Sequence, residues 1–417
     1  CSSDLIAVIP TIGAALMRDC YIGDMRCWSS PAADDDGISL LASTLTDCLE
    51  ANRRGTHRLG LLRGRETALR MPLDGFDALM TQLGPVGVVD MTADIQQIRM
   101  IKSRAEQGKL RHICGIASTV FDDMPQWVTA GLPLDAVFRQ FKIRALKAGV
   151  DDVSYLVGAA GPGGYGDIIA PPTARPLATG DVLMLDTGCI WDGYFCDFDR
   201  NFAIGHATDA AMAAHHRLYD AIDAALSMLR PGIMAADLFT VMHHMLYPED
   251  SVGAAGDDVG RYGHGLGIQL TEPPSHTSWD KTVIKSGMAL TLEPSISYGN
   301  GLIMVAEENL LVTDDGRLMT RLRQGFGGSA GAVRRRRIAL ARVAQDQEVH
   351  VAREGTDGVL DGFSFDRRGR REVADLQDAY AEDVAGAGEG QERPRRWLRE
   401  IEHRPLMRQQ GLEEVVS

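Results

Sequence analysis

The sequence predicts an α+β fold in which a unit of two helices and two strands is used twice. Helices are indicated where apolar residues recur every three or four positions, and strands where short apolar runs are bounded by turn residues. The order helix, helix, strand, strand then recurs along the chain, which suggests a duplication. The expected helices cover 97 to about 128, 134–148, about 209–229 and 235–246, and the expected strands 182–190, 194–204, 288–293 and 302–313.

The clearest helix covers residues 134–148. Pro133 precedes it and Gly149 follows it, which are typical residues for the start and the end of a helix. Its apolar residues fall at helical spacing, so one face is expected to be buried. These residues are Leu134, Val137, Phe138, Phe141, Ala145 and Ala148.

Two further segments flank the unit of residues 96–323, which contains these helices and strands. Residues 1–95 alternate short apolar runs with a helical stretch, which predicts a smaller α/β domain; the chain opens inside a strand-like run without Met, so we expect this domain to be N-terminally truncated. Residues 324–417 are rich in Arg and Gly, contain no Lys and show poor apolar periodicity. They are predicted to be a disordered tail, or, as an alternative, a non-native, out-of-frame translation.

Composition excludes several classes of protein. The chain of 417 residues carries 43 basic and 57 acidic side chains, a net charge of −14, which argues against nucleic acid or an anionic membrane as partner. Seven scattered cysteines form no C-x-x-C pair, so neither a zinc ribbon nor a disulfide framework is indicated, and a reducing cytoplasm is expected. A long apolar run that could cross a membrane is absent from the sequence.

The first indication of a metal-binding or catalytic site is a predicted hairpin around Asp192-Gly193. This dipeptide favours a two-residue turn. If Trp191 faces Tyr194, then Asp186 faces Asp199, and Asp197 lies diagonally on the same face. Asp186 follows a continuous apolar run, where an acid needs a partner. Two carboxylates at such a spacing, about 7–8 Å, can hold two cations.

Three more candidates follow in the chain. His264 lies between Gly263 and Gly265, so its backbone can approach neighbours closely. Glu293 ends one apolar strand and Glu307 lies inside another, each an acid in a core-like setting. Carboxylate and imidazole groups are ligands of divalent metal ions, although either glutamate alone could be a charge at the end of a strand.

The ordered set Asp186, Asp197, His264, Glu293 and Glu307 resembles the ligands of the pita-bread metallohydrolases, the family of methionine aminopeptidase, aminopeptidase P, prolidase and creatinase. The resemblance covers about residues 95–320 and rests on D-x(10)-D, HGLG, TLEP and AEENLLVT. The stretch DIQQIRMIKSRAEQGKLR is similar to the linker and first helix of the creatinase-like branch. The implied fold is the duplicated αββ unit around a curved antiparallel sheet.

The resemblance implies two divalent metal ions, with Mn²⁺ placed first and Co²⁺, Fe²⁺ or Zn²⁺ as alternatives. Asp197 and Glu307 would bridge them, Asp186 would bind one, and His264 and Glu293 the other. The implied reaction is hydrolysis of a peptide or amide bond near an N-terminus, as in Xaa-Pro aminopeptidases and dipeptidases, by a metal-activated bridging hydroxide with Glu293 as proton carrier. A homodimer is implied as well.

The sequence departs from the family pattern where substrate groups are bound. Thr271 replaces a histidine seven residues after His264, the region around Asp167 lacks another, and Val305 replaces an arginine. The alternatives are therefore the same centre acting on a small non-peptide C–N or lyase substrate, or a metal-free binding module. Asp199 could accept a hydrogen bond near the metals or pair with Arg200. The candidate substrate-binding residues are Asp167, Tyr194, Tyr262 and Thr271.

Overall fold

The computed structural model describes residues 5–20, 23–33, 36–51, 58–248, 260–299, 301–313 and the backbone of 317–318. The predicted C-terminal tail 324–417 lies outside the described residues, so its disorder stays a prediction. In the part of the chain that is described, no helix is both long enough and apolar enough to cross a bilayer.

The N-terminal segment alternates strands and helices, as its sequence predicts. Strands β1 (Ile6–Pro10) and β2 (Asp24–Trp28) pair in parallel, and so do β3 (Arg58–Leu61) and β4 (Gly87–Asp90). Helices α2 (Ile38–Ala51) and α3 (Leu73–Leu83) pack on each other through Ile38, Ala42 and Leu79, and a short helix α1 covers Ala14–Met17. Parallel pairs joined by helices are the α/β arrangement that was expected.

The first long helix of the catalytic unit is split, which corrects the prediction of one helix from 97 to about 128. Helix α4 (Thr92–Met100) ends before Lys102, and α5 (Arg104–Asp123) begins at the cap residue Ser103. The Ser103 side chain accepts from Glu106 N, and the Glu106 carboxylate accepts from Ser103 N at 2.7 Å. This capping box starts a new helix at that point. Helix α6 (Leu134–Ala148) has the predicted bounds and ends at Gly149 in a left-handed conformation.

The first sheet contains β5 (Asp152–Pro162), β6 (Asp181–Trp191), β7 (Tyr194–Phe195) and β8 (Phe198–Ala203), with β6 in the centre. Strand β5 is absent from the predicted set. The hairpin prediction is confirmed: Asp192 and Gly193 have φ of 47° and 79°, and Trp191 pairs with Tyr194. The same register places Asp186 opposite Asp199. The turn dipeptide therefore fixes which acids share a face.

The second unit repeats the order, with helices α7 (Asp209–Met228) and α8 (Ala235–Leu246) followed by strands. One sheet has the order β10-β9-β11-β14-β15, and β12 and β13 form a separate antiparallel pair. The predicted strand 302–313 is interrupted around Glu307, as the strand 194–204 is interrupted around Asp197. The bounds are β9 His264–Gly265, β10 Glu272–Ser275, β11 Ala289–Leu292, β12 Ser295–Tyr298, β13 Leu302–Val305, β14 Glu308–Leu311 and β15 Arg317–Leu318.

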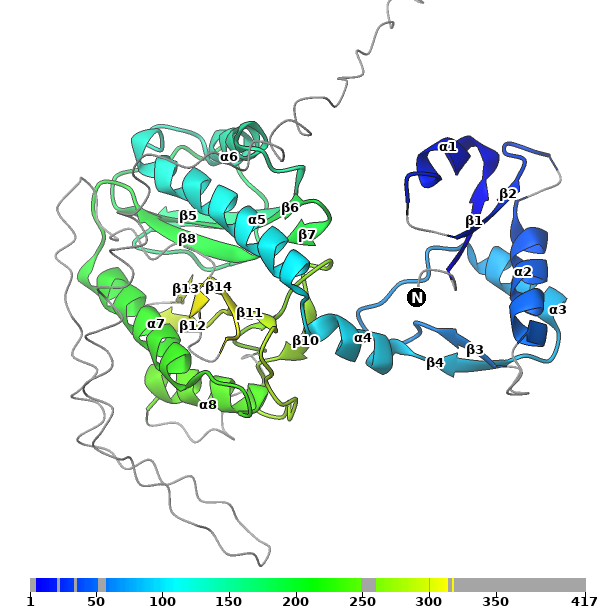
Figure 1. The fold of residues 1–417 in the computed structure, drawn as a ribbon. Helices are drawn as coiled ribbons and strands as arrows, with labels where there is room; N and C mark the ends of the chain where they lie inside the picture. The colour runs from blue at the N-terminus through cyan, green and yellow to red at the C-terminus, as the bar shows by residue number, and fades with distance from the viewer. Residues whose placement is uncertain are drawn as a thin grey trace, which may run out of the picture. The chain divides into compact units, whose positions relative to one another are not determined.

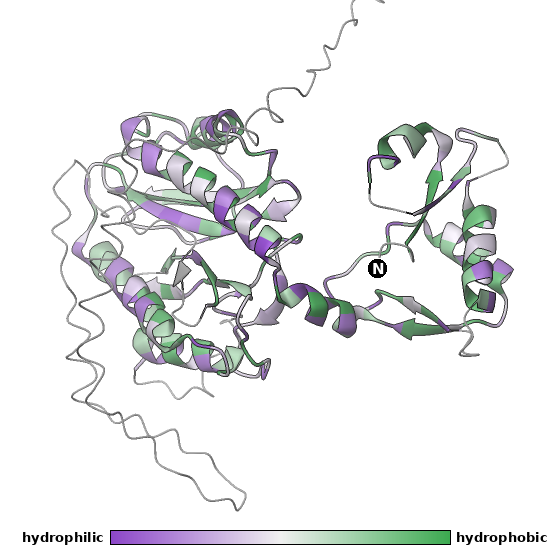
Figure 2. Ribbon diagram, viewed as in Figure 1, coloured by the Kyte–Doolittle hydropathy of each residue, from purple (hydrophilic) through white to green (hydrophobic). Residues whose placement is uncertain are grey.

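Each helix pair covers its own strands (Figure 1). Helices α5 and α6 pack on the first sheet in a core that includes Phe121, Phe141 and Phe198, while α7 and α8 enclose a core with Leu218, Phe239 and Leu290. Figure 2 shows a hydrophilic run along β8, within this apolar setting. Asp199, Arg200 and Asn201 of β8 are all buried. Buried polar side chains need hydrogen-bond or ion-pair partners. Strand β8 begins at Phe198, directly after Asp197.

Candidate metal centre

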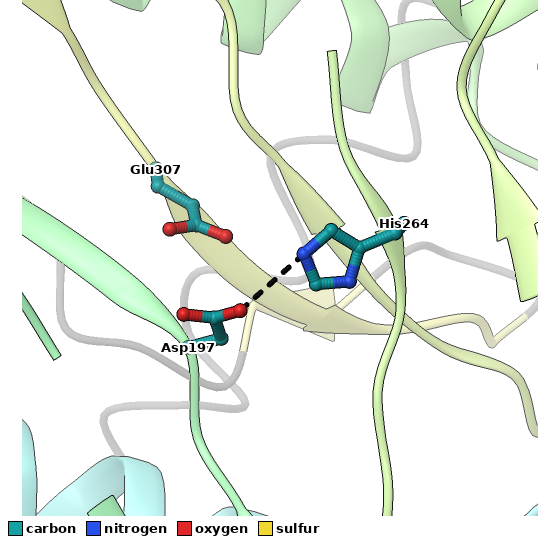
Figure 3. A group of neighbouring side chains, drawn as sticks. All are labelled: Asp197, His264 and Glu307. Atoms are coloured by element: carbon teal, nitrogen blue, oxygen red, sulfur yellow. Dashed lines mark ion pairs between the residues drawn. The ribbon is translucent and has the colours of Figure 1, made fainter. Parts of the chain in front are cut away.

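Three side chains from distant parts of the chain meet between the two sheets. One ligand atom each of Asp197, His264 and Glu307 lies within 4.8 Å of the others, and all three residues are buried. His264 Nε2 is 3.3 Å from Asp197 Oδ2, and Figure 3 shows the carboxylates and the imidazole turned toward one another. Two carboxylates and one imidazole within this distance are a donor set for a divalent cation.

The backbone at Asp197 is held by Asn309 of the neighbouring strand β14. Asn309 Oδ1 accepts from Asp197 N at 2.9 Å, and Asn309 Nδ2 donates to the Asp197 carbonyl. Strands β7 and β8 both pair with β6, and Asp197 lies in the interruption between them. The Asn309 amide thus supplies backbone hydrogen bonds at this interruption. Because Asn309 follows Glu307 by two residues, this contact also brings the interruption in the second unit to the interruption in the first.

His264 is oriented by the strand β11 and by its own neighbour. Its backbone N donates to Thr291 Oγ1 at 3.1 Å, and its ring Nδ1 lies 2.8 Å from the Gly265 carbonyl oxygen. A carbonyl only accepts, so Nδ1 carries the proton and Nε2 keeps a free lone pair directed at the acids. This tautomer is the one that binds a metal through Nε2.

The two remaining predicted ligands lie beside this cluster. Glu293 Oε2 is 3.9 Å from His264 Nε2, and its side chain is 29% exposed, against 7% for Asp197. Burial, and then the nearby charges of Asp197 and Glu293, raise the pKa of the Asp186 carboxyl group. The structure therefore brings all five predicted residues into one acidic site.

Burial without a counter-ion makes the carboxylates of this site hard to ionise. Desolvation raises the pKa of Asp197 to about 8 and raises those of Asp186, Glu293 and Glu307. Among the described residues, neither Asp186 Oδ1 nor Glu307 Oε1 has a hydrogen-bond partner, and both atoms are buried. Buried carboxylate oxygens that lack a hydrogen-bond partner would be stabilised by bound cations. The donor set thus fits divalent metal ions.

Arg200 follows Asp199, the acid for which the sequence leaves two roles open. Arg200 Nη2 pairs with Glu308 Oε2 at 3.0 Å, and Nη1 donates to the carbonyl oxygens of Asp199 and Glu307. The Asp199 carboxylate accepts from Asn201 Nδ2 at 3.4 Å. Burial, and then the charge of Asp186, raise its pKa, whereas the charge of Arg200 lowers it. Glu308 points away from the cluster, as strand alternation predicts.

Sequence reasoning missed two polar residues of this site. The Tyr155 hydroxyl of β5 hydrogen-bonds to the Asp186 carboxylate, and four site acids raise its pKa together with burial. Arg261 lowers the pKa of Asp197 and of Glu293 by its charge. Tyr155 is placed by the pairing of β5 with β6, which no local signal indicates. Arg261, three residues before His264, could have been noted as a cation beside a ligand.

The four candidate substrate residues are scattered. Tyr262 is fully buried in the core, stacked on Phe239 with its hydroxyl 3.2 Å from His243 Nδ1, so it is a core aromatic. Tyr194 donates to Glu106 Oε1 at 3.0 Å, and Asp167 is exposed and accepts from Ile169 N. Only Thr271 contacts a residue at the site, because its hydroxyl accepts from Arg261 Nη2 at 3.3 Å.

Replacing Gly263 by alanine is expected to loosen the metal site. Gly263 has a φ of +130°, and a Cβ there would lie 2.3 Å from the Thr291 carbonyl oxygen, so β9 must move away from β11 and carry His264 with it. We expect metal affinity to fall by about 10- to 100-fold, measured by elemental analysis after dialysis. The control is Gly131→Ala, at a φ of +89° with open space around it, which costs only about 1–2 kcal/mol of backbone strain. Equal metal content in both variants would contradict this account.

Residues 108–314 match the sequence model of metallopeptidase family M24. Among curated relatives, an uncharacterized peptidase of Staphylococcus aureus is 27% identical over 234 residues, which are 55% of this chain and 64% of that protein. The chain thus spans just under two thirds of the length of this relative. Residues 108–314 contain all five predicted ligands: Asp186, Asp197, His264, Glu293 and Glu307.

Solved structures share the fold. An X-Pro aminopeptidase from Thermotoga maritima superimposes with a TM-score of 0.64 at 19% identity, over 77% of this chain and 87% of that one. A Xaa-Pro dipeptidase from Bacillus anthracis gives 0.65 at 19% identity, over 77% and 85%. The predicted pita-bread fold is therefore confirmed, with its mixture of helices and antiparallel strands.

Proposed function

We propose that this chain, whose residues 108–314 belong to metallopeptidase family M24, is a dinuclear metal-dependent hydrolase that cleaves a peptide bond next to proline at an N-terminus. The single observation that carries the proposal is the buried cluster of Asp197, His264 and Glu307 with Glu293 and Asp186 beside it. Five donors are more than one cation in a tetrahedral site requires, which favours two ions. Mn²⁺ is the first candidate, and a cytoplasmic homodimer remains a prediction.

Asp197 and Glu307, the acids of the two strand interruptions, would be the ligands that the two ions share, as the resemblance to the pita-bread metallohydrolases implies. Asp186 would hold one ion, and His264 and Glu293 the second. When bound, the two cations supply Lewis-acid activation of water and of the scissile carbonyl. The asparagine contacts at Asp197 and the threonine contact at His264 hold these ligands in place before metal arrives.

Glu293 is the best placed residue to move a proton. Its side chain is the most exposed of the acids whose contacts define the cluster, so water and substrate can reach it. In the metal-free protein burial raises the pKa of the Glu293 carboxyl group. A carboxylate that water can reach is able to take a proton and to return it. The Tyr155 hydroxyl donates its one proton to the Asp186 carboxylate, so its oxygen can accept a hydrogen bond from a bound group.

The test is hydrolysis of a peptide panel by protein reconstituted with Mn²⁺ or Co²⁺. We expect cleavage of X-Pro dipeptides or of tripeptides with proline in second position, and none by the protein in chelator. Two bound metals with no turnover of any peptide would reject the peptidase proposal. Activity on small C–N compounds alone would instead select the alternative that the missing histidine at Thr271 and the missing arginine at Val305 favour.

A further inference from the structure

Glu272 is a buried acid of β10 that the proposed reaction does not use. Lys102 Nζ donates to its Oε2 at 2.9 Å, and Arg99 Nη2 donates to its Oε1. The side chains of Glu272 and Lys102 are 4% and 2% exposed, and that of Arg99 is 22% exposed. Arg99 belongs to α4, and Lys102 follows this helix by two residues. The ion triad of Arg99, Lys102 and Glu272 therefore joins the chain before α5 to the second sheet.

An ion triad of this kind fixes a position more than it adds stability. Taking charged groups out of water costs about as much free energy as their mutual attraction returns, so the net gain is small. Every arrangement that separates the charges, in contrast, leaves a buried ion without a partner. Burial lowers the pKa of the Lys102 ammonium group, and the charge of Glu272 opposes this shift. The triad therefore holds β10 at one place relative to α4.

The Glu272 carboxylate also shapes the loop of residues 266–271, which joins β9 to β10. Gln269 N donates to Glu272 Oε1 at 3.2 Å, and Gly267 N donates to the Gln269 carbonyl oxygen at 3.1 Å. Arg99 Nη2 donates to Gln269 Oε1, also at 3.2 Å. A Cβ at Gly267 would lie 2.8 Å from both Glu272 carboxylate oxygens, closer than real Cβ contacts. The shape of this loop therefore depends on where the carboxylate is held.

The loop 266–271 contacts the first sheet at two places. Phe195 N of β7 donates to the Gly267 carbonyl oxygen at 2.9 Å. Leu270 occupies the space over Gly188 of β6, since a Cβ at Gly188 would lie 2.4 Å from Leu270 Cδ1. Each of these contacts lies two residues from a predicted aspartate ligand of the first sheet. The loop therefore bears on both chain segments that carry these aspartates.

The two ends of the loop are fixed to the strand of His264. Gly265, next to His264 in β9, is paired with Glu272 of β10 on one side and with Leu290 of β11 on the other. A displacement of β10 therefore acts directly on β9. The loop and its flanking strands thus connect the aspartates of the first sheet to the imidazole of the second.

We propose that Glu272, held by Arg99 and Lys102, is a positioning residue for the metal centre. Through the loop 266–271 it sets the distance between the aspartates of the first sheet and His264. The inference rests on the metal centre of the proposed function, and it adds that the chain before α5 takes part in assembling that centre. Glu272 itself touches neither metal nor substrate; it acts through the backbone of the loop and of β9.

Hydrogen exchange in chelator tests the positioning role without metal. The variants are Glu272→Gln and the double variant Lys102→Met/Glu272→Gln, which removes the ammonium as well and so leaves no unpaired charge at that position. The control is Asp181→Asn, an acid at the start of β6 that is 1% exposed and bound by an arginine at 2.9 Å. We expect amides of residues 193–198 and 264–272 to exchange at least about tenfold faster in both variants, and at wild-type rates in the control. Equal rates in all proteins would overturn the proposal.

Calorimetric titration with Mn²⁺ measures the consequence for the metal centre. We expect the dissociation constant to rise about 10- to 100-fold in Glu272→Gln and in the double variant, and to keep its wild-type value in Asp181→Asn. Glu272→Asp keeps the charge on a side chain that is one methylene shorter, so it should retain more of the affinity than Glu272→Gln does. A lower stability in urea together with wild-type exchange and wild-type affinity would show that the triad is structural only and that the positioning role is wrong.

Exchange and affinity separate the positioning role from the peptidase proposal, because neither measurement uses a peptide. If wild type binds two ions but cleaves no peptide, the peptidase proposal fails, and the positioning role stands if the Glu272 variants change exchange and affinity as expected. If wild type cleaves peptides and the Glu272 variants keep wild-type exchange and affinity, the peptidase proposal stands and the positioning role is rejected.

Discussion

Replacing Asp197 by asparagine is expected to abolish metal binding and peptidase activity while making the metal-free protein more stable. Asp197 lies at the centre of the cluster, 3.3 Å from His264, and burial raises its pKa to about 8. An amide of the same shape removes the buried charge but binds divalent cations poorly. Loss of several kcal/mol of transition-state stabilisation corresponds to about a 10³-fold decrease in kcat/KM.

Three measurements check this result: elemental analysis, kcat/KM on the best peptide substrate, and unfolding by urea in chelator. The control is Asp77→Asn, an exposed acid on α3, for which all three values should stay at wild-type levels. A purely structural role for Asp197 predicts the opposite sign for stability, because asparagine would then remove a needed contact. Retention of a full metal complement by Asp197→Asn would reject the assignment of this residue as a ligand.

The sequence predicted which acids of the first sheet lie on the same face, because this depends on the turn between two strands. Asp192-Gly193 favours positive φ at both central positions, and strand alternation then assigns every residue of the hairpin to a face. Asp186 opposite Asp199 follows from this local chemistry alone, and the observed register agrees. The helix boundary at Ser103 was equally available, since the Ser103-x-x-Glu106 capping box stands in the sequence.

Other features depend on contacts between distant segments. Strand β5 contains two glycines and lacks a regular apolar alternation, so only its pairing with β6 defines it. Tyr155 reaches Asp186 through that pairing, and Asn309 reaches Asp197 across two sheets. The interruptions at Asp197 and Glu307 also look like parts of continuous strands in the sequence, because apolar or aromatic residues directly precede both acids. Tertiary contacts, and not the local sequence, direct the side chains of Asp197 and Glu307 toward the metal site.

The metal-free protein is expected to lose stability as the pH rises from about 4 to about 8. Asp197, with a pKa of about 8 when folded, keeps its proton over a range in which the unfolded chain has lost it, since an unperturbed aspartate titrates near 3.9. The folded state then binds more protons than the unfolded state, so the free energy of unfolding falls with pH in this window. Asp186, Asp199 and Glu307 have pKa values raised by the same burial, which adds to the effect.

Metal binding is expected to reverse this pH dependence. Divalent cations bind the ionised carboxylates, so the stabilisation that Mn²⁺ confers must grow as the pH rises and the ligands lose their protons. Urea unfolding at pH 4.5, 6 and 8, in chelator and in excess Mn²⁺, measures both slopes; the expected loss in chelator is several kcal/mol. Asp197→Asn should flatten the chelator curve and remove the metal effect, whereas Asp77→Asn should change neither. A stability in chelator that does not vary over this range would mean that the buried acids are already paired within the protein.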